Sequence, residues 1–148
     1  MNIYNNPIIM SILTQFNNQL SDFIGELIYL YPENKRFTVF NQKLEILRSA
    51  NPKLIIEKYI EFIYPFKNEI IAEDDEYFTS KSKNDNIQEI YSQDNVKSQN
   101  YIPIENALNL KDIWLDMNNE TKSAIWRYFK VLIILSEKWY ANEYNKKT

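Results

Sequence analysis

The side chains in this sequence that come closest to reactive groups are carboxylates. Glu73, Asp74, Asp75 and Glu76 are consecutive, and Glu69 lies about one helical turn before them. Paired carboxylates can transfer protons in an active site. A carboxylate-based enzyme would need Glu69, Glu73 or Asp75 to meet another acid or a lysine in one pocket. No motif predicts that pocket, so this enzyme is the third of three functional hypotheses.

The acidic run fits the start of a helix better than a metal site. An EF-hand loop alternates its acids with other residues and needs a glycine at a sharp turn, and this run has neither feature. Asp74 can cap a short helix through its side-chain oxygen, and acids are favourable near the positive end of the helix dipole. We therefore predict that Asp74 is an N-cap and that no metal binds here.

The residue types that the sequence lacks exclude most familiar active sites. It contains no histidine, no cysteine and one glycine. Catalytic triads, cysteine nucleophiles, the usual zinc sites and Glu-x-x-His di-iron sites need histidine or cysteine. Walker A and dinucleotide-binding loops need several glycines. We therefore expect a protein that is not an enzyme and that uses no cofactor.

The composition indicates one folded domain. The chain of 148 residues is 45% hydrophobic and 15% aromatic, which is enough for one core. The absence of cysteine gives no sign of an oxidising compartment, and the N-terminal residues lack the basic leader of a secretory signal. We expect an intracellular protein that is not secreted.

The stretch Asn118–Tyr144 predicts a long helix at the centre of the fold. Asn118 or Asn119 can cap its start, and Glu120 places an acid in the first turn. Its uninterrupted apolar run, Val131–Leu135, is far shorter than the roughly 20 residues of a membrane span. Its polar stripe is narrow and comprises Ser123, Arg127, Lys130, Glu137 and Ala141. Other helices should cover the remaining sides, which carry Ile125, Trp126, Tyr128, Phe129, Val131, Leu132, Ile133, Leu135, Trp139 and Tyr140.

The first predicted helix runs from Pro7 to Leu30 and has one apolar face. Proline suits the first helical position, and apolar residues recur behind it at spacings of three and four. The helix should end at Tyr31, because the residue before a proline avoids helical geometry. Gly25 lies inside it at a cost of about 1 kcal/mol relative to alanine. Either another helix backbone approaches closely there, which we favour, or the cost is simply carried.

Two more helices are predicted after this one. Asn34 is expected to cap the second helix, and Asn51 followed by Pro52 signals the start of the third. The third helix covers Lys53–Tyr64, and Pro65 should kink or end it.

A polar segment separates these helices from the central one. Thr79–Asn100 offers little to bury, so it predicts a flexible connection with room for one helical turn. Such a long loop is unusual in a compact domain, so it is either an insertion or a segment that orders on a partner. Ile104–Met117 carries apolar residues at near-helical spacing, which predicts one or two short helices against the base of the central helix.

Cations and tryptophans supply two candidate binding surfaces. The net charge of −3 argues against a strong grip on nucleic-acid phosphates, and a solvated helix face is the simpler reading of the cations. The indoles could stack on bases or anchor a partner, but core packing is the simpler reading for at least two of them. The phosphate-facing patch would comprise Lys35, Arg36, Lys43, Arg48 and Lys53. The partner-facing aromatics would be Trp114, Trp126 and Trp139.

Three features occur in order along the chain. They are Tyr64-Pro65-Phe66 at a helix end, an acidic cluster before Tyr77-Phe78, and Ile113-Trp114 followed by Thr121-Lys122 and Ile125-Trp126-Arg127-Tyr128. The pattern covers most of the chain outside residues 79–100, and it resembles an uncharacterised group of short proteins encoded by giant DNA viruses of protists. The resemblance implies a viral origin and a place in the host cytoplasm or the virion. It implies no activity and no site residue.

Together these patterns predict a single all-α domain, an antiparallel bundle of about five helices around the long C-terminal helix. The first functional hypothesis is a non-enzymatic viral protein that binds a host or viral protein, as a virion component or an infection-stage adaptor. The second, from another class, is a nucleic-acid-associated regulator that uses the basic patch. We expect no membrane partner, and self-association stays open as an alternative.

Overall fold

The computed structural model describes residues 7–79 and 108–147, and all regular structure in these two ranges is helical. The all-α prediction is confirmed, whereas most of the connection expected over Thr79–Asn100 lies outside the described residues. The elements in chain order are α1 (Pro7–Leu30), α2 (Lys35–Ala50), α3 (Pro52–Phe62), the 3-10 helix η2 (Tyr64–Phe66), α4 (Lys67–Ile71), α5 (Glu76–Thr79), α8 (Lys111–Trp114) and α9 (Asn119–Lys147).

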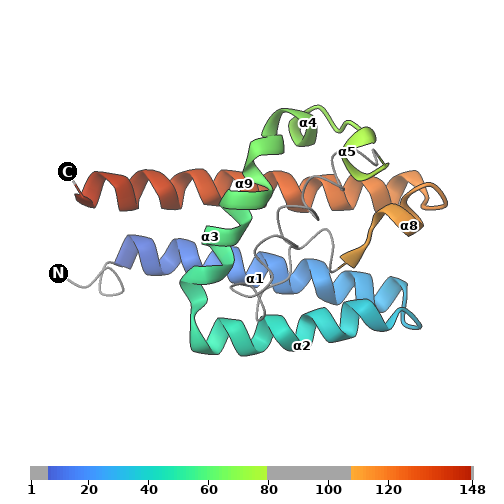
Figure 1. Cartoon of the computed structure of the whole chain (residues 1–148), viewed down its shortest axis with the longest axis horizontal. Helices are drawn as coiled ribbons and strands as arrows, with labels where there is room; N and C mark the ends of the chain where they lie inside the picture. The colour runs from blue at the N-terminus through green and yellow to red at the C-terminus, as the bar shows by residue number, and fades with distance from the viewer. Residues whose placement is uncertain (1–6, 80–107, 148) are drawn as a thin grey trace, which may run out of the picture.

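The two longest helices, α1 and α9, form the body of the fold. They lie side by side in opposite directions and share the most extensive contact between any two of the described elements, while α2 returns along α1 (Figure 1). Helix α3 does not join this antiparallel arrangement and instead crosses both α1 and α9 (Figure 1). A single residue, Asn51, links α2 to α3. The chain therefore turns sharply between them and has no loop that could bring α3 parallel to α2. The antiparallel bundle predicted from the sequence therefore holds for α1, α2 and α9.

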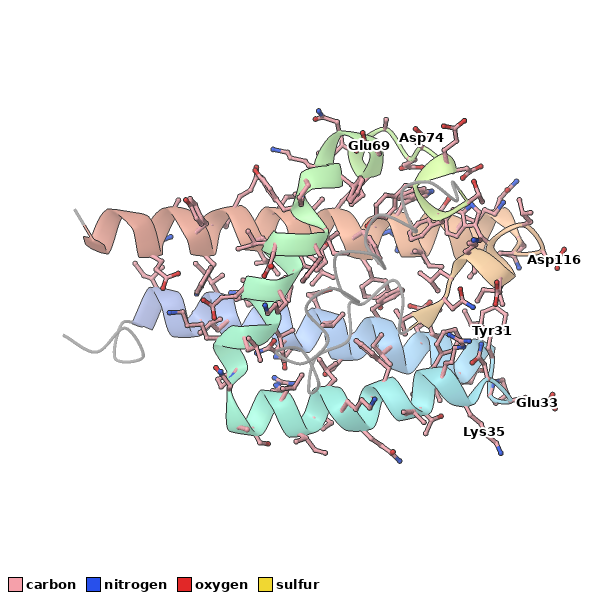
Figure 2. The ribbon with its side chains drawn as sticks, in the orientation of Figure 1. Tyr31, Glu33, Lys35, Glu69, Asp74 and Asp116 are labelled. Carbon is pink, nitrogen blue, oxygen red and sulfur yellow. The ribbon has the colours of Figure 1, made fainter. Side chains whose placement is uncertain are left out.

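Side-chain caps form at two of the three helix starts that were predicted at asparagines. The Asn34 side chain accepts a hydrogen bond from the Arg36 amide (3.1 Å), and the Asn118 side chain accepts one from the Thr121 amide (2.8 Å). Asn51 precedes α3 as predicted but makes no side-chain cap bond, and its backbone N–H closes the last turn of α2 instead. Figure 2 shows the α1–α2 turn at one end of the molecule.

Three short helices, η2, α4 and α5, follow α3. Pro65 lies inside η2, so the α-helix ends before it, as the sequence predicted. After α4, Glu73 adopts the left-handed backbone conformation that ends many helices (φ 54°). The Asp74 carboxylate then accepts a hydrogen bond from the Glu76 amide at 3.0 Å, which confirms Asp74 as the cap of α5.

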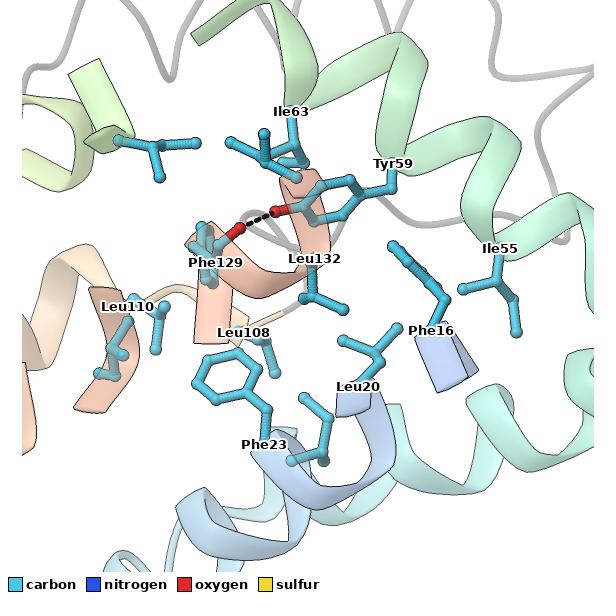
Figure 3. Packing of buried hydrophobic residues seen from close by; sticks show 14 of the residues in the cluster. Phe16, Leu20, Phe23, Ile55, Tyr59, Ile63, Leu108, Leu110, Phe129 and Leu132 are labelled. Atoms are coloured by element: carbon cyan, nitrogen blue, oxygen red, sulfur yellow. Dashed lines mark hydrogen bonds between the residues drawn. The ribbon is translucent and has the colours of Figure 1, made fainter. Parts of the chain in front are cut away.

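One apolar core joins α1, α3 and α9 to the segment around α8. Phe129 of α9 lies at its centre, and its backbone carbonyl accepts a hydrogen bond from the Tyr59 hydroxyl at 3.0 Å (Figure 3). The prediction that α9 is covered by the earlier helices is confirmed for both Trp126 and Phe129, which are 3% and 0% exposed. No described helix combines the length and apolar character that crossing a bilayer requires.

All three tryptophans belong to this core. Trp114, Trp126 and Trp139 are at most 3% exposed, so core packing is confirmed for each of them. Their proposed role as partner-facing aromatics is wrong for the folded chain, because their indole rings fill space between helices.

The last turns of α9 are less covered than the sequence predicted. Tyr140 was expected on the buried side and is instead 57% exposed. Helix α3 crosses α9 rather than lying along it, so one flank of α9 beside the crossing has no described helix over it (Figure 1).

The close approach expected at Gly25 is also absent. A Cβ atom added at Gly25 would meet nothing within 4 Å, and the residue is exposed. We expect Gly25→Ala to raise the free energy of unfolding by about 0.5–1 kcal/mol, because alanine restricts the unfolded chain and favours the helix. Urea denaturation would measure the change, and a less stable variant would show that this position needs glycine.

Candidate functional site

A groove lies beside the crossing of α3 and α9. Its volume is about 470 Å³, which falls within the range of roughly 300–1,000 Å³ typical of ligand sites. Its lining comprises Ile60, Tyr64, Ser136, Glu137 and Tyr140.

The residues that line this groove come from the end of α3, from η2 and from α9, and most of the surface that they present is apolar. Pro65 ends α3 and the tight turn of η2 follows, with Tyr64 as its first residue. Ser136 is buried, and its hydroxyl donates a hydrogen bond to the Leu132 carbonyl at 2.7 Å, so the hydroxyl proton is already used within α9. Tyr140 stands more than half exposed beside it. Among the described residues that line the groove, Glu137 is the charged one.

Glu137 anchors a small polar network at the edge of the groove. The Tyr64 hydroxyl donates a hydrogen bond to Glu137 Oε2 at 2.8 Å, and Lys67 Nζ donates one to the same oxygen at 2.5 Å. Lys67 Nζ also lies 5.8 Å from the centroid of the Tyr64 ring, within the range of a cation–π contact. The Glu137 and Lys67 side chains are 38% and 36% exposed, so solvent and other molecules can reach both.

The network favours the protonation state that each of its three members ordinarily has at neutral pH. Hydrogen bonds from Lys67 and Tyr64 lower the pKa of the Glu137 carboxyl. The same bonds to Glu137 raise the pKa of both the Tyr64 hydroxyl and the Lys67 ammonium. At neutral pH the carboxyl is ionised, the lysine is charged and the tyrosine is neutral. These shifts move all three groups away from the proton exchange that acid–base catalysis requires and suit them to holding a fixed charge.

Glu137 should make the stability of the protein depend on pH. Its pKa in the folded protein is below the ordinary value of 4.5, so its stabilising effect is present above that value and is lost as the pH falls through the folded pKa. We expect the wild type to be more stable than Glu137→Gln at neutral pH, and the difference to disappear in strong acid. Urea denaturation at several pH values would measure this difference.

The matched control for this experiment is Glu33→Gln, since Glu33 lies at the α1–α2 turn, far from the groove (Figure 2). A stability difference between wild type and Glu137→Gln that is constant with pH would contradict the role of the ionised carboxylate.

The acids named in the carboxylate-enzyme hypothesis have separate surroundings in the described residues. Glu73 pairs with Lys130 at 2.5 Å, and Asp75 accepts a hydrogen bond from the Trp114 indole at 3.1 Å. One carboxylate oxygen of Glu69 is buried without a hydrogen-bond partner in the described residues. These acids therefore serve separate structural contacts. Nor is any group of three or more acidic residues in ranges 7–79 and 108–147 arranged to hold a metal ion.

Two members of the predicted phosphate-facing patch are held by other side chains. Arg48 donates hydrogen bonds to Asn18 and Ser21 of α1. Lys53 pairs with Glu143 of α9 at 2.9 Å, and the Glu143 side chain is 10% exposed. These two cations join helices to each other, which is a role that sequence spacing did not reveal.

The other three members of the patch are exposed. Lys35, Arg36 and Lys43 are exposed on α2, and Lys35 lies at the α1–α2 turn (Figure 2). Because a helix rises about 1.5 Å per residue, Lys35 and Arg48 stand about 20 Å apart along α2. The five cations therefore have different environments: Arg48 and Lys53 contact other helices, and the other three are exposed on α2.

Comparison with known proteins adds no further guide to the site. No family of known proteins, no curated protein and no solved structure matches this chain. The groove is identified from its geometry alone.

The sequence carried partial signals for this groove. Tyr64 was recognised at a helix end and Glu137 was placed on the polar stripe of α9, but neither was recognised as a site residue. The contact between Tyr64 and Glu137 spans 73 residues and depends on the angle at which α3 crosses α9. The local signal for the groove was Glu137 followed three residues later by Tyr140 on the same helix.

Proposed function

We propose that this chain is a non-enzymatic binding protein that holds a segment of a partner protein in the groove between α3 and α9. The observation that supports the proposal is an accessible groove of about 470 Å³ with Ile60 and Tyr140 in its lining. Exposed tyrosine next to apolar surface is typical of protein interfaces, where one ring supplies a large contact area with few rotatable bonds.

The polar network favours recognition over chemistry at this groove. Glu137 and Lys67 carry opposite charges that neighbouring hydrogen bonds maintain, and Tyr64 stays protonated. Such fixed charges orient a partner and discriminate among partners. The volume of the groove suits a few side chains of one segment. The rest of the interface with the partner would lie outside the groove.

The biological setting in this proposal rests on the sequence resemblance. We propose that the protein acts in the host cytoplasm or within the virion of a giant DNA virus, as an adaptor or a packaged component. Mass spectrometry of purified particles would detect a packaged protein, and its absence from both particles and infected cytoplasm would reject this setting.

Site-specific photo-crosslinking tests the binding function. A photoreactive phenylalanine analogue would replace Tyr140 in one variant and Tyr29 in a matched control, because Tyr29 is 82% exposed on α1. We expect the variant at position 140 to form a cross-link with one other protein in cells that contain the natural partners, and the control at position 29 to lack that product.

The same experiment identifies two outcomes that contradict the proposal. Equal products from both positions would show that the groove has no special role. A product that contains two copies of this chain would show self-association in place of a separate partner.

A further inference from the structure

The Glu137 carboxylate has one oxygen that the network does not use. Both hydrogen bonds from Tyr64 and Lys67 go to Oε2, and in the described residues Oε1 receives none. Glu137 lines the groove, whereas Lys67 reaches the carboxylate without lining it. An ionised carboxylate offers about four acceptor positions on its two oxygens. The carboxylate that lines the groove therefore keeps an acceptor oxygen that a bound cation can use while Lys67 stays in place.

The chain itself shows which cation these groups accommodate. The ammonium group of Lys67 lies 2.5 Å from the carboxylate and 5.8 Å from the Tyr64 ring. One alkylammonium group thus already contacts both a negative oxygen and an aromatic face. Tyr140 and Ile60 line the same groove and provide apolar surface for a methylene chain.

We propose that the groove receives a lysine side chain from the partner protein, an inference that rests on the proposed function. The ammonium group donates to Glu137 Oε1, and the methylene chain packs against Ile60 and Tyr140. The net charge of −3 on the whole chain complements a basic partner segment.

Lysine fits this site better than arginine. A guanidinium group binds a carboxylate most strongly when its two parallel N–H groups reach both oxygens. Glu137 Oε2 already accepts from Tyr64 and Lys67, so the carboxylate has one fully available oxygen. An ammonium group acts as a compact point charge and needs no second oxygen.

Small analogues of the side chain test this proposal directly. The full chain would be titrated with n-butylammonium, n-butanol, butyrate and n-butylguanidinium at constant ionic strength, with the backbone amides of Glu137 and Tyr140 followed by NMR. We expect n-butylammonium to bind several-fold more tightly than n-butanol, because of one exposed ion pair with Glu137 Oε1. We also expect butyrate to bind most weakly and n-butylguanidinium to bind less tightly than n-butylammonium.

Two variants separate the charge of Glu137 from the shape of the groove. Glu137→Gln should abolish the preference for n-butylammonium over n-butanol. Lys67→Met should instead increase the affinity for n-butylammonium several-fold, because it removes the competing ammonium group, and should leave n-butanol binding unchanged. A merely structural role for the network would make both variants weaken all the probes together.

The outcomes distinguish this inference from the function on which it rests. Equal binding of n-butylammonium and n-butanol, preferred binding of butyrate, or no binding of any probe would overturn the lysine proposal. The proposed function would survive each of these results if position 140 still formed its specific cross-link. A lost cross-link with retained n-butylammonium preference would overturn the protein-binding function and leave a site for free amines.

Discussion

Replacing Phe129 with alanine should lower the free energy of unfolding by about 3–5 kcal/mol, the usual cost of removing a buried phenylalanine ring. The Phe129 side chain is 0% exposed. Its ring centroid lies 5.4–6.4 Å from those of Phe23, Tyr59, Tyr77 and Phe78, which come from α1, α3 and α5. The variant would leave a cavity where four elements meet, and domains of this size are stable by only about 5–15 kcal/mol in total.

Urea denaturation followed by tryptophan fluorescence would measure this loss. The matched control is Ile134→Ala on the same helix, because Ile134 is 50% exposed and should change stability by less than about 1 kcal/mol. A loss at Phe129 no larger than that at Ile134 would show that α9 is not the centre of the core.

Helix boundaries could be predicted from the sequence because their causes are local. Asn34 and Asn118 each cap a helix through a bond to a residue two or three positions later. Pro65 ends α3 through its own ring. The apolar spacing along α1 and α9 is also a property of neighbouring residues in the sequence. It was therefore enough to predict the all-α fold and the central position of α9.

The contacts between distant helices could not be predicted in the same way. Lys53 was grouped with the cations of α2, but it pairs with Glu143, which is 90 residues away along the chain. Tyr140 was placed in the core on its apolar character, but the crossing angle of α3 leaves it exposed. Crossing angles depend on how whole helix surfaces fit together, and residue spacing within one helix does not specify them.

The groove was missed for the same reason. Its lining combines Ile60 and Tyr64 from one region with Ser136, Glu137 and Tyr140 from another. Each of these residues has an ordinary local explanation, as part of an apolar face, a helix end or a polar stripe. The site exists because α3 and η2 bring those two regions together at the crossing.

Replacing Trp114 with alanine should also cause a large loss of stability, and this loss should be confined to the region around α5 and α8. Trp114 is 0% exposed, its ring centroid lies 4.4 Å from that of Phe78, and its indole donates to Asp75. It also lies 5.3 Å from Trp126, so it connects α5 and α8 to α9. Helices α5 and α8 have four residues each and are far too short to persist without packing.

Hydrogen exchange would show whether the damage stays local. We expect Trp114→Ala to cost about 3–5 kcal/mol in packing. Amides in Glu76–Thr79 and Lys111–Trp114 should lose protection by several orders of magnitude, while those of α1 keep most of theirs. Trp114→Phe should retain most of the protection, because it loses the bond to Asp75 but keeps a ring against Phe78. An equal loss of protection in α1 would instead mean that α5 and α8 unfold only together with the whole domain. In that case the loss of Trp114 would destabilise α9 and, through it, every helix that α9 contacts.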